Sequence, residues 1–308
     1  MKKVLVVGIG EHAKRRILPA LSSVNGIENI FITSRTEVKN LNSDHVFLSK
    51  EEILNSNYLF DSIIISSVPS VHIENLQEFR NKSKYFLIEK PLTSKLDYVN
   101  SNEFLDLNKN IDIKECLMYI HHPIYNEFKK IIRNNKLEKV LASFKIPHLD
   151  KNNFRYSKQS GASSILDQGI YPISLILENF TIDENSMINS ISFDRDLNID
   201  TGGNLKCKSS DGIDIEINWG IGGEYSNFVE VYSKDSTYKF DMFFSKPENF
   251  VSSYSVNAQG TSDSISIGIF DQFKIMYEDL MINQKKFSYN SYDNLLNRYK
   301  LIRKLIND

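Results

Sequence analysis

The stretch Lys2-Lys3-Val4-Leu5-Val6-Val7-Gly8-Ile9-Gly10-Glu11-His12-Ala13 decides the fold of this chain. A short apolar run leads directly into a G-x-G-x-x-A turn, and the residues after it have a helical pattern. Gly8 permits the tight turn, Gly10 lets the backbone approach a pyrophosphate, and the small Ala13 allows a helix to pack closely on a strand. The N-terminus of that helix adds partial positive charge facing the phosphates. The stretch therefore predicts the entry to a dinucleotide-binding domain.

Apolar strands and helical stretches alternate through the rest of the N-terminal part. We expect strands at 30–33, 61–66 and 85–88, with a further strand opening at residue 111. Helices are expected between them, including 13–23 and 71–80. Short apolar strands separated by helices are typical of a parallel sheet that is covered on both faces. A ligand then binds beyond the carboxyl ends of the strands.

The pattern changes after about residue 138. Apolar and polar side chains alternate at 140–146, 212–219 and 228–232, which predicts a mostly antiparallel sheet with one buried face. Helical patterns return at 165–177, 270–282 and 292–306. The predicted fold class is α/β, with an N-terminal Rossmann domain at 1–118 and a C-terminal α+β domain with a large open sheet at 119–308. The terminal helix is free to pack back on the first domain. Because the sheet is expected to be open, with one apolar face and an exposed face available for contact, we expect a homodimer or homotetramer formed through this sheet.

Length and composition bound the function classes. The chain has 308 residues, which favours two domains, and 41% of them are hydrophobic and 25% charged, with a formal net charge of -2. This balance favours neither a nucleic-acid partner nor an anionic membrane. Cys116 and Cys207 lie far apart, so neither a disulfide framework nor a metal cluster is indicated. No apolar stretch approaches the length of a membrane span. We expect a cytoplasmic protein.

The end of the second predicted strand indicates which dinucleotide is bound. A carboxylate there would favour NAD, because it accepts hydrogen bonds from the ribose 2′-hydroxyl. The residues here are Thr33-Ser34-Arg35-Thr36. The guanidinium of Arg35 and the hydroxyls of Ser34 and Thr36 suit a 2′-phosphate, which predicts NADP (NADPH). The alternative interpretation is that Arg35 is a solvated loop charge.

Two further segments indicate a family. Ile88-Glu89-Lys90-Pro91-Leu92 contains an E-K-P signature at the end of a predicted strand, and Gly161 to Tyr171 reads G-A-S-S-I-L-D-Q-G-I-Y, similar to a G-G-G-x-x-x-D-x-G-x-H/Y signature. With the opening turn and the loop Val68-Pro69-Ser70-Val71-His72, the chain resembles the glucose–fructose oxidoreductase / inositol dehydrogenase superfamily over both domains. Within it, Tyr171 in place of the commoner His is similar to the branch that contains nucleotide-sugar ketoreductases. The fold of that family agrees with the two patterns described above.

The resemblance implies the cofactor site and one catalytic residue. The implied cofactor contacts come from three regions: the opening turn with Gly8, Gly10, Glu11 and His12; the segment Ser34, Arg35 and Thr36; and Pro69, His72, Glu89 and Lys90. Lys90 follows a buried strand and precedes Pro91, so its ammonium is expected at the carboxyl end of that strand. There it would stabilise negative charge on a substrate oxygen. In isolation, Glu89 and Lys90 could also be surface charges before a turn.

Asp167 and Tyr171 are four residues apart in a predicted helix and therefore share a face. The resemblance implies that this face points into a substrate cleft. A phenol near Lys90 would have its anion favoured by the cation, so Tyr171 is the predicted general acid for reduction, or general base for oxidation. Asp167 is predicted to orient a substrate hydroxyl or Lys90. The alternative is a core aromatic and a surface carboxylate.

Substrate contacts are predicted for His122 and Arg155. The sequence has His121-His122-Pro123 where many relatives carry an arginine, which is similar to nucleotide-sugar C-3 ketoreductases. A histidine here could touch substrate or equally cap the next helix, and both interpretations stay open. Arg155, in the polar and aromatic loop 147–156, could bind a diphosphate or be a solvated loop charge. Neither histidine has the companions that a metal site needs, so no metal is expected.

The sequence thus predicts an NADP-dependent oxidoreductase that transfers hydride between the nicotinamide and a carbinol or ketone carbon of a sugar or nucleotide-sugar. Two alternatives remain open. One is a dehydrogenase of a free sugar, polyol or cyclic diol. The other is a catalytically silent regulator that only binds NADP.

Overall fold

The computed structural model of this chain describes residues 2–35, 42 and 44–307. They form two compact units. Unit 1 comprises the chain up to residue 117 together with 159–161 and 273–292, and unit 2 comprises 118–158, 162–272 and the chain from 293 onward. The predicted domain boundary between 118 and 119 stays a prediction; in the structure, two later segments also pack with unit 1.

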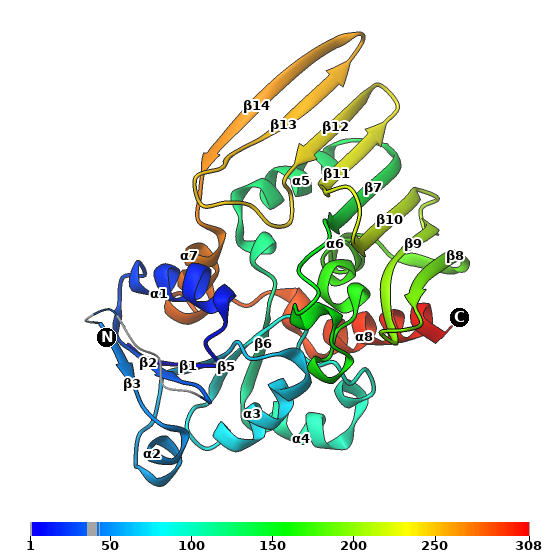
Figure 1. The fold of residues 1–308 in the computed structure, drawn as a ribbon. Helices are drawn as coiled ribbons and strands as arrows, with labels where there is room; N and C mark the ends of the chain where they lie inside the picture. Colours follow the sequence, from blue (N-terminus) through cyan, green and yellow to red (C-terminus); the bar gives the residue numbers. More distant parts are fainter. Residues whose placement is uncertain (1, 36–41, 43, 308) are drawn as a thin grey trace. The chain divides into compact units, whose positions relative to one another are not determined.

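Unit 1 is built on a six-stranded sheet in which every neighbouring pair is parallel (Figure 1). In order across the sheet, the strands are β3 (His45–Phe47), β2 (Ile27–Thr33), β1 (Lys2–Val7), β4 (Ser62–Ile65), β5 (Tyr85–Glu89) and β6 (Asp112–Cys116). The order reverses direction between β1 and β4. Loops that follow these two strands run to opposite faces of the sheet, which opens a crevice at the carboxyl ends in this kind of fold. The predicted Rossmann domain is confirmed.

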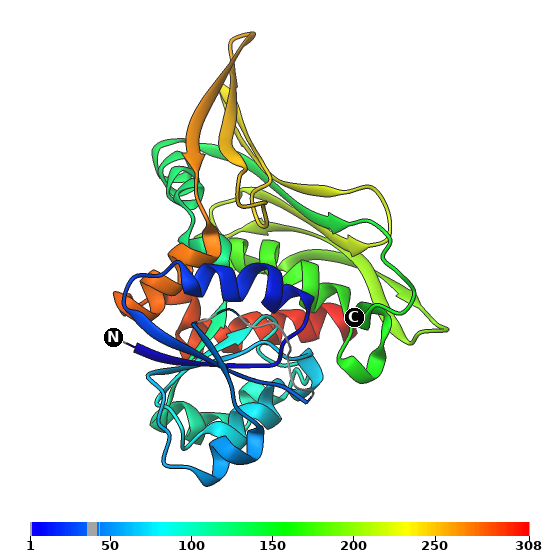
Figure 2. The same ribbon diagram turned by 60° about the vertical axis from the view of Figure 1, so that its left-hand side comes forward.

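Helices cover both faces of this sheet, which explains why its central strands are apolar throughout. Figure 2 shows α1 on one face and α3 and α4 on the other. The helical elements of unit 1 are η1 (Ala13–Ile17, a π-helical segment), α1 (Leu18–Ser22), α2 (Lys50–Asn55), η2 (Pro69–Val71), α3 (His72–Phe79), η3 (Tyr98–Asn100), α4 (Asn102–Asn110), α7 (Gln272–Tyr277), η8 (Glu278–Ile282) and η9 (Ser288–Asn290). Phe273 of α7 packs against His12 and Arg16, so the returning segment lies beside the first helix.

Unit 2 contains an eight-stranded, mostly antiparallel sheet, as predicted. Its order is β14 (Thr261–Ile269), β13 (Val251–Ala258), β12 (Ser236–Asp241), β11 (Ser226–Ser233), β7 (Leu137–Ile146), β10 (Asp214–Ile221), β9 (Ile199–Ser209) and β8 (Ile182–Asp194). Only the pair β7 and β10 is parallel among these described strands. The helical elements are η4 (Met118–His121), α5 (Pro123–Asn134), η5 (Phe154–Tyr156), η7 (Ile165–Gly169), α6 (Ile170–Asn179) and α8 (Tyr292–Asn307). The short η6 (Lys158–Ser160) begins in unit 2, and its last two residues belong to unit 1.

One face of this sheet is apolar and is covered by the η7–α6 segment of the same chain. The indole of Trp219 in β10 fixes how closely the two layers approach. A Cβ atom at Gly203 of β9 would lie 2.3 Å from the indole ring, and one at Gly169 of η7 would lie 3.1 Å from it. Both glycines therefore leave room for the indole, and the segment that carries Asp167 and Tyr171 is seated directly on the sheet.

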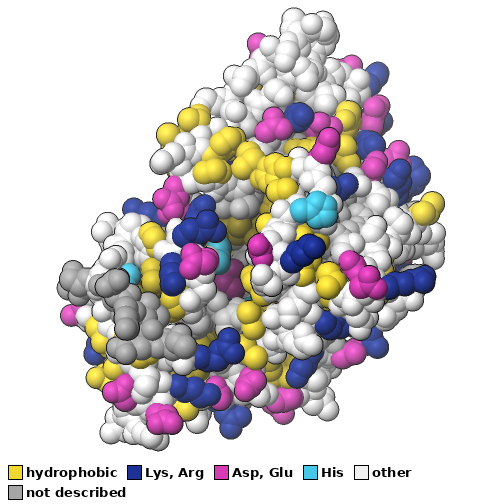
Figure 3. All heavy atoms as spheres, viewed as in Figure 1, with side chains coloured by type: hydrophobic (Ala, Val, Ile, Leu, Met, Phe, Trp, Pro, Cys, Tyr) yellow, Lys and Arg dark blue, Asp and Glu magenta, His cyan; other side chains and the backbone are white. Residues whose placement is uncertain are grey.

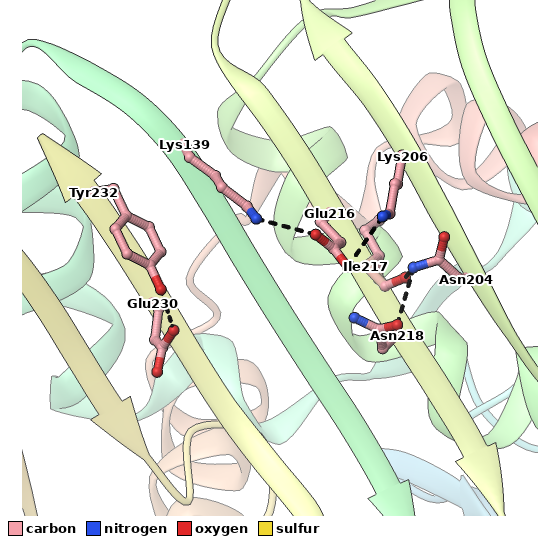
Figure 4. A network of polar contacts seen from close by, with 8 residues as sticks. All are labelled: Lys139, Asn204, Lys206, Glu216, Ile217, Asn218, Glu230 and Tyr232. Atoms are coloured by element: carbon pink, nitrogen blue, oxygen red, sulfur yellow. Dashed lines mark hydrogen bonds and ion pairs between the residues drawn. The ribbon is translucent and has the colours of Figure 1, made fainter.

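The opposite face of the sheet is polar (Figure 4). Lys139 and Lys206 both approach Glu216, at 3.0 Å and 3.8 Å, and the amide of Asn204 donates to Asn218. The apolar face is thus the one that the η7–α6 segment covers, and the oligomer expected through this sheet stays a prediction. An oligomer formed through this sheet would use polar contacts.

The surface mixes charges of both signs. On the face drawn in Figure 3, Lys and Arg side chains are interspersed with Asp and Glu. This pattern agrees with the small net charge of -2. Across the described part of the chain, no helix has both the length and the apolar composition that crossing a membrane requires.

Candidate functional site

The predicted phosphate turn has the backbone geometry that its glycines indicate. Gly8 follows β1 with φ of 93°, in the left-handed region, and a Cβ there would lie 2.7 Å from the backbone nitrogen of Ser67. The hydroxyl of Ser66 donates to the carbonyl of Gly8 at 2.7 Å, which ties the ends of β1 and β4 together. A Cβ at Gly10 would meet nothing within 4 Å. Only the first glycine is thus required by the protein's own packing, and open space lies above the second.

Glu89, the last residue of β5, carries a buried oxygen with unmet hydrogen-bonding capacity. The residue is 7% exposed, and its Oε1 accepts no hydrogen bond from the described residues. The Nε2 atom of the half-exposed His12 ring lies 3.8 Å from Oε1, beyond hydrogen-bond distance. Leaving a buried carboxylate oxygen without a donor costs on the order of 1–3 kcal/mol or more. This oxygen is therefore suited to a donor that a ligand brings.

Lys90 is half-buried and stands at the carboxyl edge of the sheet, before a cis peptide bond to Pro91. Pro69 begins η2 after β4, and His72 follows at the start of α3. The ring of His72 is 1% exposed and lies between two backbone carbonyls, with Nδ1 2.9 Å from Pro91 O and Nε2 2.9 Å from Ser67 O. Burial lowers the pKa of His72, although both carbonyls and the nearby carboxylates oppose the shift. The predicted cofactor contact of His72 stays a prediction, and its observed role is to join two loops.

The residues predicted to select the dinucleotide follow β2. Ser34 is half-buried and Arg35 is exposed. Thr36 lies outside the described residues. Glu11, in the first turn of the helix that follows the glycine turn, is exposed and lies 3.3 Å from the ammonium of Lys14. Because all the strands are parallel, the carboxyl ends of β1, β2, β4 and β5 bring the predicted cofactor residues of unit 1 to one edge of the sheet.

In unit 2, Arg155 and Asp167, for which the sequence predicted separate roles, form an ion pair. The Nε of Arg155 donates to Oδ2 of Asp167, which also accepts a 2.6 Å hydrogen bond from the amide of Gln168. The guanidinium of Arg155 also lies over the ring of Phe154. Burial disfavours its charge, but the Asp167 carboxylate outweighs burial and holds the pKa of Arg155 above its ordinary value. The alternative of a solvated loop charge for Arg155 is therefore wrong.

Tyr171 is 3% exposed and lies at the start of α6, just after the π-helical segment that holds Asp167. Its ring packs against Phe144 and Phe244, with ring centroids 5.1 Å and 6.0 Å away, as the core-aromatic alternative expects. Its hydroxyl donates to the sulfur of Met118 at 3.4 Å. Electrostatic interaction with Tyr171 also contributes to the raised pKa of Arg155. A thioether is a weak acceptor. The contact with Met118 is therefore a weak hydrogen bond.

The two adjacent histidines are buried. His122 is the N-cap of α5: its Nδ1 accepts from the N–H of Ile124 at 3.1 Å, and its Nε2 lies 3.3 Å from the hydroxyl of Ser252. Burial, reinforced by the ammonium of Lys246, lowers the pKa of His122 to about 3. His121 is 6% exposed. The capping interpretation is confirmed for His122, and its contact with substrate stays a prediction.

Sequence reasoning missed the residues that hold the Asp167–Tyr171 segment in place. Oδ2 of Asp200 in β9 accepts from the hydroxyl of Ser164 at 2.6 Å and from the N–H of Ile165 at 2.8 Å, which caps the start of this segment. Asp200 is 36 positions away from Ser164, so no local pattern could have found it. Met118 was missed for the same reason, since it is 53 positions away from Tyr171, whereas Gln168 directly follows Asp167 and its contact needed the structure to be seen. Within the described residues, no group of three or more His, Cys, Asp or Glu side chains could hold a metal ion.

Comparison with known proteins gives sequence relatives that include several 3-reductases of one name. No protein-family model matches the chain. The chain is 23% identical over 281 residues to a dTDP-3,4-didehydro-2,6-dideoxy-alpha-D-glucose 3-reductase of Saccharopolyspora spinosa, an alignment that covers 88% of this chain and 84% of that one. A 3-reductase of the same name from Actinomadura kijaniata is 22% identical and covers the same shares.

Solved structures share the complete fold. The 3-ketoreductase KijD10 from Actinomadura kijaniata, crystallised with NADP and TDP-benzene, superposes with a TM-score of 0.86 at 20% identity over 99% of this chain and 97% of that one. An aldose-aldose oxidoreductase from Caulobacter crescentus gives a TM-score of 0.81 at 15% identity, over 99% and 96% of the two chains. These comparisons confirm the resemblance to the glucose–fructose oxidoreductase / inositol dehydrogenase superfamily and, within it, to the nucleotide-sugar ketoreductases.

Proposed function

We propose that this protein is an NADP-dependent oxidoreductase that transfers hydride between the nicotinamide and a ketone or carbinol carbon of a nucleotide-sugar. The observation that carries the proposal is the carboxyl edge of the unit 1 sheet, where the glycine turn, Glu89 and Lys90 lie together. The relatives that match 88% of the chain are named as reductases of dTDP-linked sugars. This supports a nucleotide-sugar over a free sugar as the substrate class.

The residues present fit a dinucleotide. The open space at Gly10 and the helix N-terminus beyond it suit a pyrophosphate, because backbone N–H groups and the helix dipole face it there. The unmet acceptor capacity of Glu89 Oε1 suits an amide or hydroxyl donor of the cofactor. Arg35, exposed directly after β2, would pair with a 2′-phosphate. The absence of a carboxylate at that position supports NADP over NAD.

The chemistry then divides between two side chains. The bound NADPH supplies a hydride to the carbonyl carbon. Lys90 would hold the carbonyl oxygen through its ammonium and stabilise the negative charge that develops there. Tyr171 would give its phenolic proton to that oxygen, so that the ketone becomes an alcohol. In the oxidative direction, Tyr171 would take the proton back.

In this mechanism, the positive charge of Arg155 would stabilise the anion of Tyr171. When Tyr171 gives up its proton, a phenolate remains, and the neighbouring guanidinium favours that anion. Asp167 would hold Arg155 in place through the ion pair rather than act on Lys90. A diphosphate contact of Arg155 stays part of the proposal, because a guanidinium carries five N–H donors and the pair with Asp167 uses the one at Nε.

We also propose a homodimer or homotetramer in a reducing, cytoplasmic compartment. The free, buried thiols of Cys116 and Cys207 support a reducing environment. The polar outer face of the unit 2 sheet, with its rows of paired charges, supports an interface held by hydrogen bonds and ion pairs. Sedimentation in low and high salt tests this, since such an interface weakens as salt rises.

The test of the proposed function is a fluorescence titration with NADPH and NADH, followed by a panel of dTDP-linked keto-sugars and the matching free keto-sugars. We expect NADPH to bind more tightly than NADH, and one dTDP-linked member to oxidise it. Lys90→Met serves as the control that should bind NADPH but turn over about 10²–10³-fold more slowly. Equal rates on linked and free sugars would instead support a free-sugar dehydrogenase. Tight binding without turnover over the whole panel would support a silent regulator.

A further inference from the structure

Two buried side chains from different elements make hydrogen-bond contacts with the backbone of the residues that follow Lys90. In α3, Nδ1 of His72 lies 2.9 Å from the carbonyl oxygen of Pro91. At β6, the carboxylate of Glu115 accepts a 2.6 Å hydrogen bond from the N–H of Leu92. His72 is 1% exposed and Glu115 is fully buried. The two residues that follow Lys90 are thus fixed through their main chain.

Each of the two side chains also has a second contact, although a neutral imidazole donates through only one of its ring nitrogens. The second ring nitrogen of His72 lies 2.9 Å from the carbonyl of Ser67, in the loop after β4 that packs on Gly8. The backbone N–H of Glu115 donates to Oδ1 of Asn290 at 2.8 Å, and Asn290 is 6% exposed. The loops after β4 and β5 and the end of β6 are therefore connected by side chains that cross from one element to the next.

The choice of residue types indicates a role beyond stability. Burying a carboxylate and an imidazole removes both from water, which is costly, and apolar side chains would fill the same space without that cost. What they provide is directed hydrogen bonding to one carbonyl and one N–H. Lys90 has a flexible four-carbon stem, so the position of its ammonium depends on the backbone from which the stem starts. A displacement of about 1 Å at a reacting group can cost about 100-fold in rate.

We propose that His72 and Glu115 are positioning residues for Lys90, which clamp the backbone of Pro91 and Leu92 so that the ammonium stands at the substrate oxygen. The proposal rests on the function proposed for Lys90 above. His72 then affects the reaction through Lys90 rather than through the dinucleotide. Glu115, which the sequence did not indicate as a site residue, acts in the same way.

Matched substitutions separate the clamp from general packing. His72→Asn keeps an N–H donor at the place of Nδ1 and so keeps the Pro91 contact, whereas His72→Gln keeps only a donor at the place of Nε2. Glu115→Gln keeps an acceptor for Leu92, whereas Glu115→Met keeps the length and removes the acceptor. We expect His72→Gln and Glu115→Met to lower kcat about 10- to 100-fold with little change in KM for NADPH. The other two variants should stay within about 3-fold of the wild type.

Leu76→Ala provides the stability control. Leu76 is a fully buried residue of α3, the same helix as His72, and its side chain makes no hydrogen bond. Its truncation should lower the unfolding temperature at least as much as the two damaging variants, while kcat stays near that of the wild type. If Leu76→Ala loses as much kcat as His72→Gln, general destabilisation explains the losses and the proposal is overturned.

A double-mutant cycle with Lys90→Met decides whether the clamp acts through Lys90. Single-turnover rates with enzyme in excess make the slow variants measurable. We expect Glu115→Met to slow the wild type but to change the rate of Lys90→Met less than 2-fold. Losses that multiply in the double variant would overturn the proposal.

Hydrogen exchange tests the clamp without any turnover. In the unliganded protein, peptides covering residues 90–95 should exchange faster in Glu115→Met than in Glu115→Gln, because the N–H of Leu92 has lost its acceptor. Unchanged exchange would overturn the clamp even if the enzyme is active. If the wild type reduces no member of the substrate panel, the proposed function fails, while the exchange result still decides whether the clamp exists.

Discussion

Three glycine substitutions in unit 1 would test the dinucleotide site against the protein's own packing. Gly8→Ala places a Cβ 2.7 Å from the backbone nitrogen of Ser67 at a φ of 93°. The left-handed backbone alone costs about 1–2 kcal/mol, and the displacement of Ser67 adds to it. Gly10→Ala adds a methyl group with no neighbour within 4 Å, so the free energy of unfolding should change by no more than about 0.5 kcal/mol. Yet this methyl would fill the space that we assign to the pyrophosphate, so NADPH affinity should fall at least about tenfold, or roughly 1.4 kcal/mol.

Gly26→Ala is the matched control. Gly26 also has a left-handed φ, of 98°, but the nearest contact of its Cβ would be the side chain of Ile282 at 3.4 Å. It should lose about 1–2 kcal/mol of stability and keep its NADPH affinity. Urea unfolding followed by circular dichroism and titration of NADPH fluorescence measure the two quantities. If Gly10→Ala binds NADPH as tightly as the wild type, the glycine turn does not hold the pyrophosphate and the reasoning is refuted.

Three more predictions concern single side chains. Lys90→Met should lower kcat by about 10²–10³-fold while NADPH affinity stays within about 3-fold, and wild-type turnover in stopped-flow assays would remove Lys90 from the mechanism. Arg35→Asp should repel the 2′-phosphate and shift the ratio of the Kd values of NADPH and NADH at least about tenfold toward NADH; an unchanged ratio would mean that another group reads this phosphate. His122 has its pKa lowered to about 3, so it stays neutral in the fold and takes up a proton on unfolding below pH 6.5. Stability from this group is therefore present above about pH 6.5 and is lost as pH falls toward 3, with a loss of about 2 kcal/mol between pH 7 and pH 5. His122→Asn, which keeps an N-cap, should remove this part of the pH dependence when unfolding is followed by the fluorescence of Trp219; identical slopes for both proteins would contradict the prediction.

The parts of the fold that the sequence predicted are those in which burial dictates a pattern. Four strands of unit 1 are apolar because helices cover both faces, and alternation in 140–146 and 228–232 marked strands with one buried face. The short β3 and the edge strand β14 carried no such signal. β14 has the sequence Thr-Ser-Asp-Ser-Ile-Ser-Ile-Gly-Ile and is mostly exposed, so burial imposed no alternation on it. The sequence does carry a local signal for the start of α2, because Ser49 and Glu52 form a capping box there.

The residues of the candidate site likewise fall into those that local sequence patterns predict and those that only the structure reveals. Gly8, Glu89 and Lys90 follow directly from strand ends, so the sequence could place them at one edge of a parallel sheet. The role of His122 could not be settled from sequence, because both helix capping and substrate binding use an imidazole nitrogen. The distance to the N–H of Ile124 shows the capping, and the substrate contact stays a prediction. Asp200 and Glu115 act across 36 and 23 positions respectively. Contacts of that range depend on how strands are ordered, which local patterns do not encode.

The pairing of Arg155 with Asp167 changes how the proposed acid is understood. Sequence reasoning gave these two residues separate tasks and expected the charge that favours the Tyr171 anion to come from Lys90. In the structure, Asp167 pairs with the guanidinium of Arg155, and electrostatic interaction with Tyr171 helps to hold the pKa of Arg155 above its ordinary value. Asp200 fixes the start of the segment that carries Asp167 and Tyr171. Lys90, in turn, is fixed by contacts that lie wholly within unit 1. In the proposed reaction, the group that gives the proton and the group that holds the substrate oxygen are therefore fixed by separate sets of contacts. We expect a substitution that disturbs one set to leave the geometry of the other unchanged.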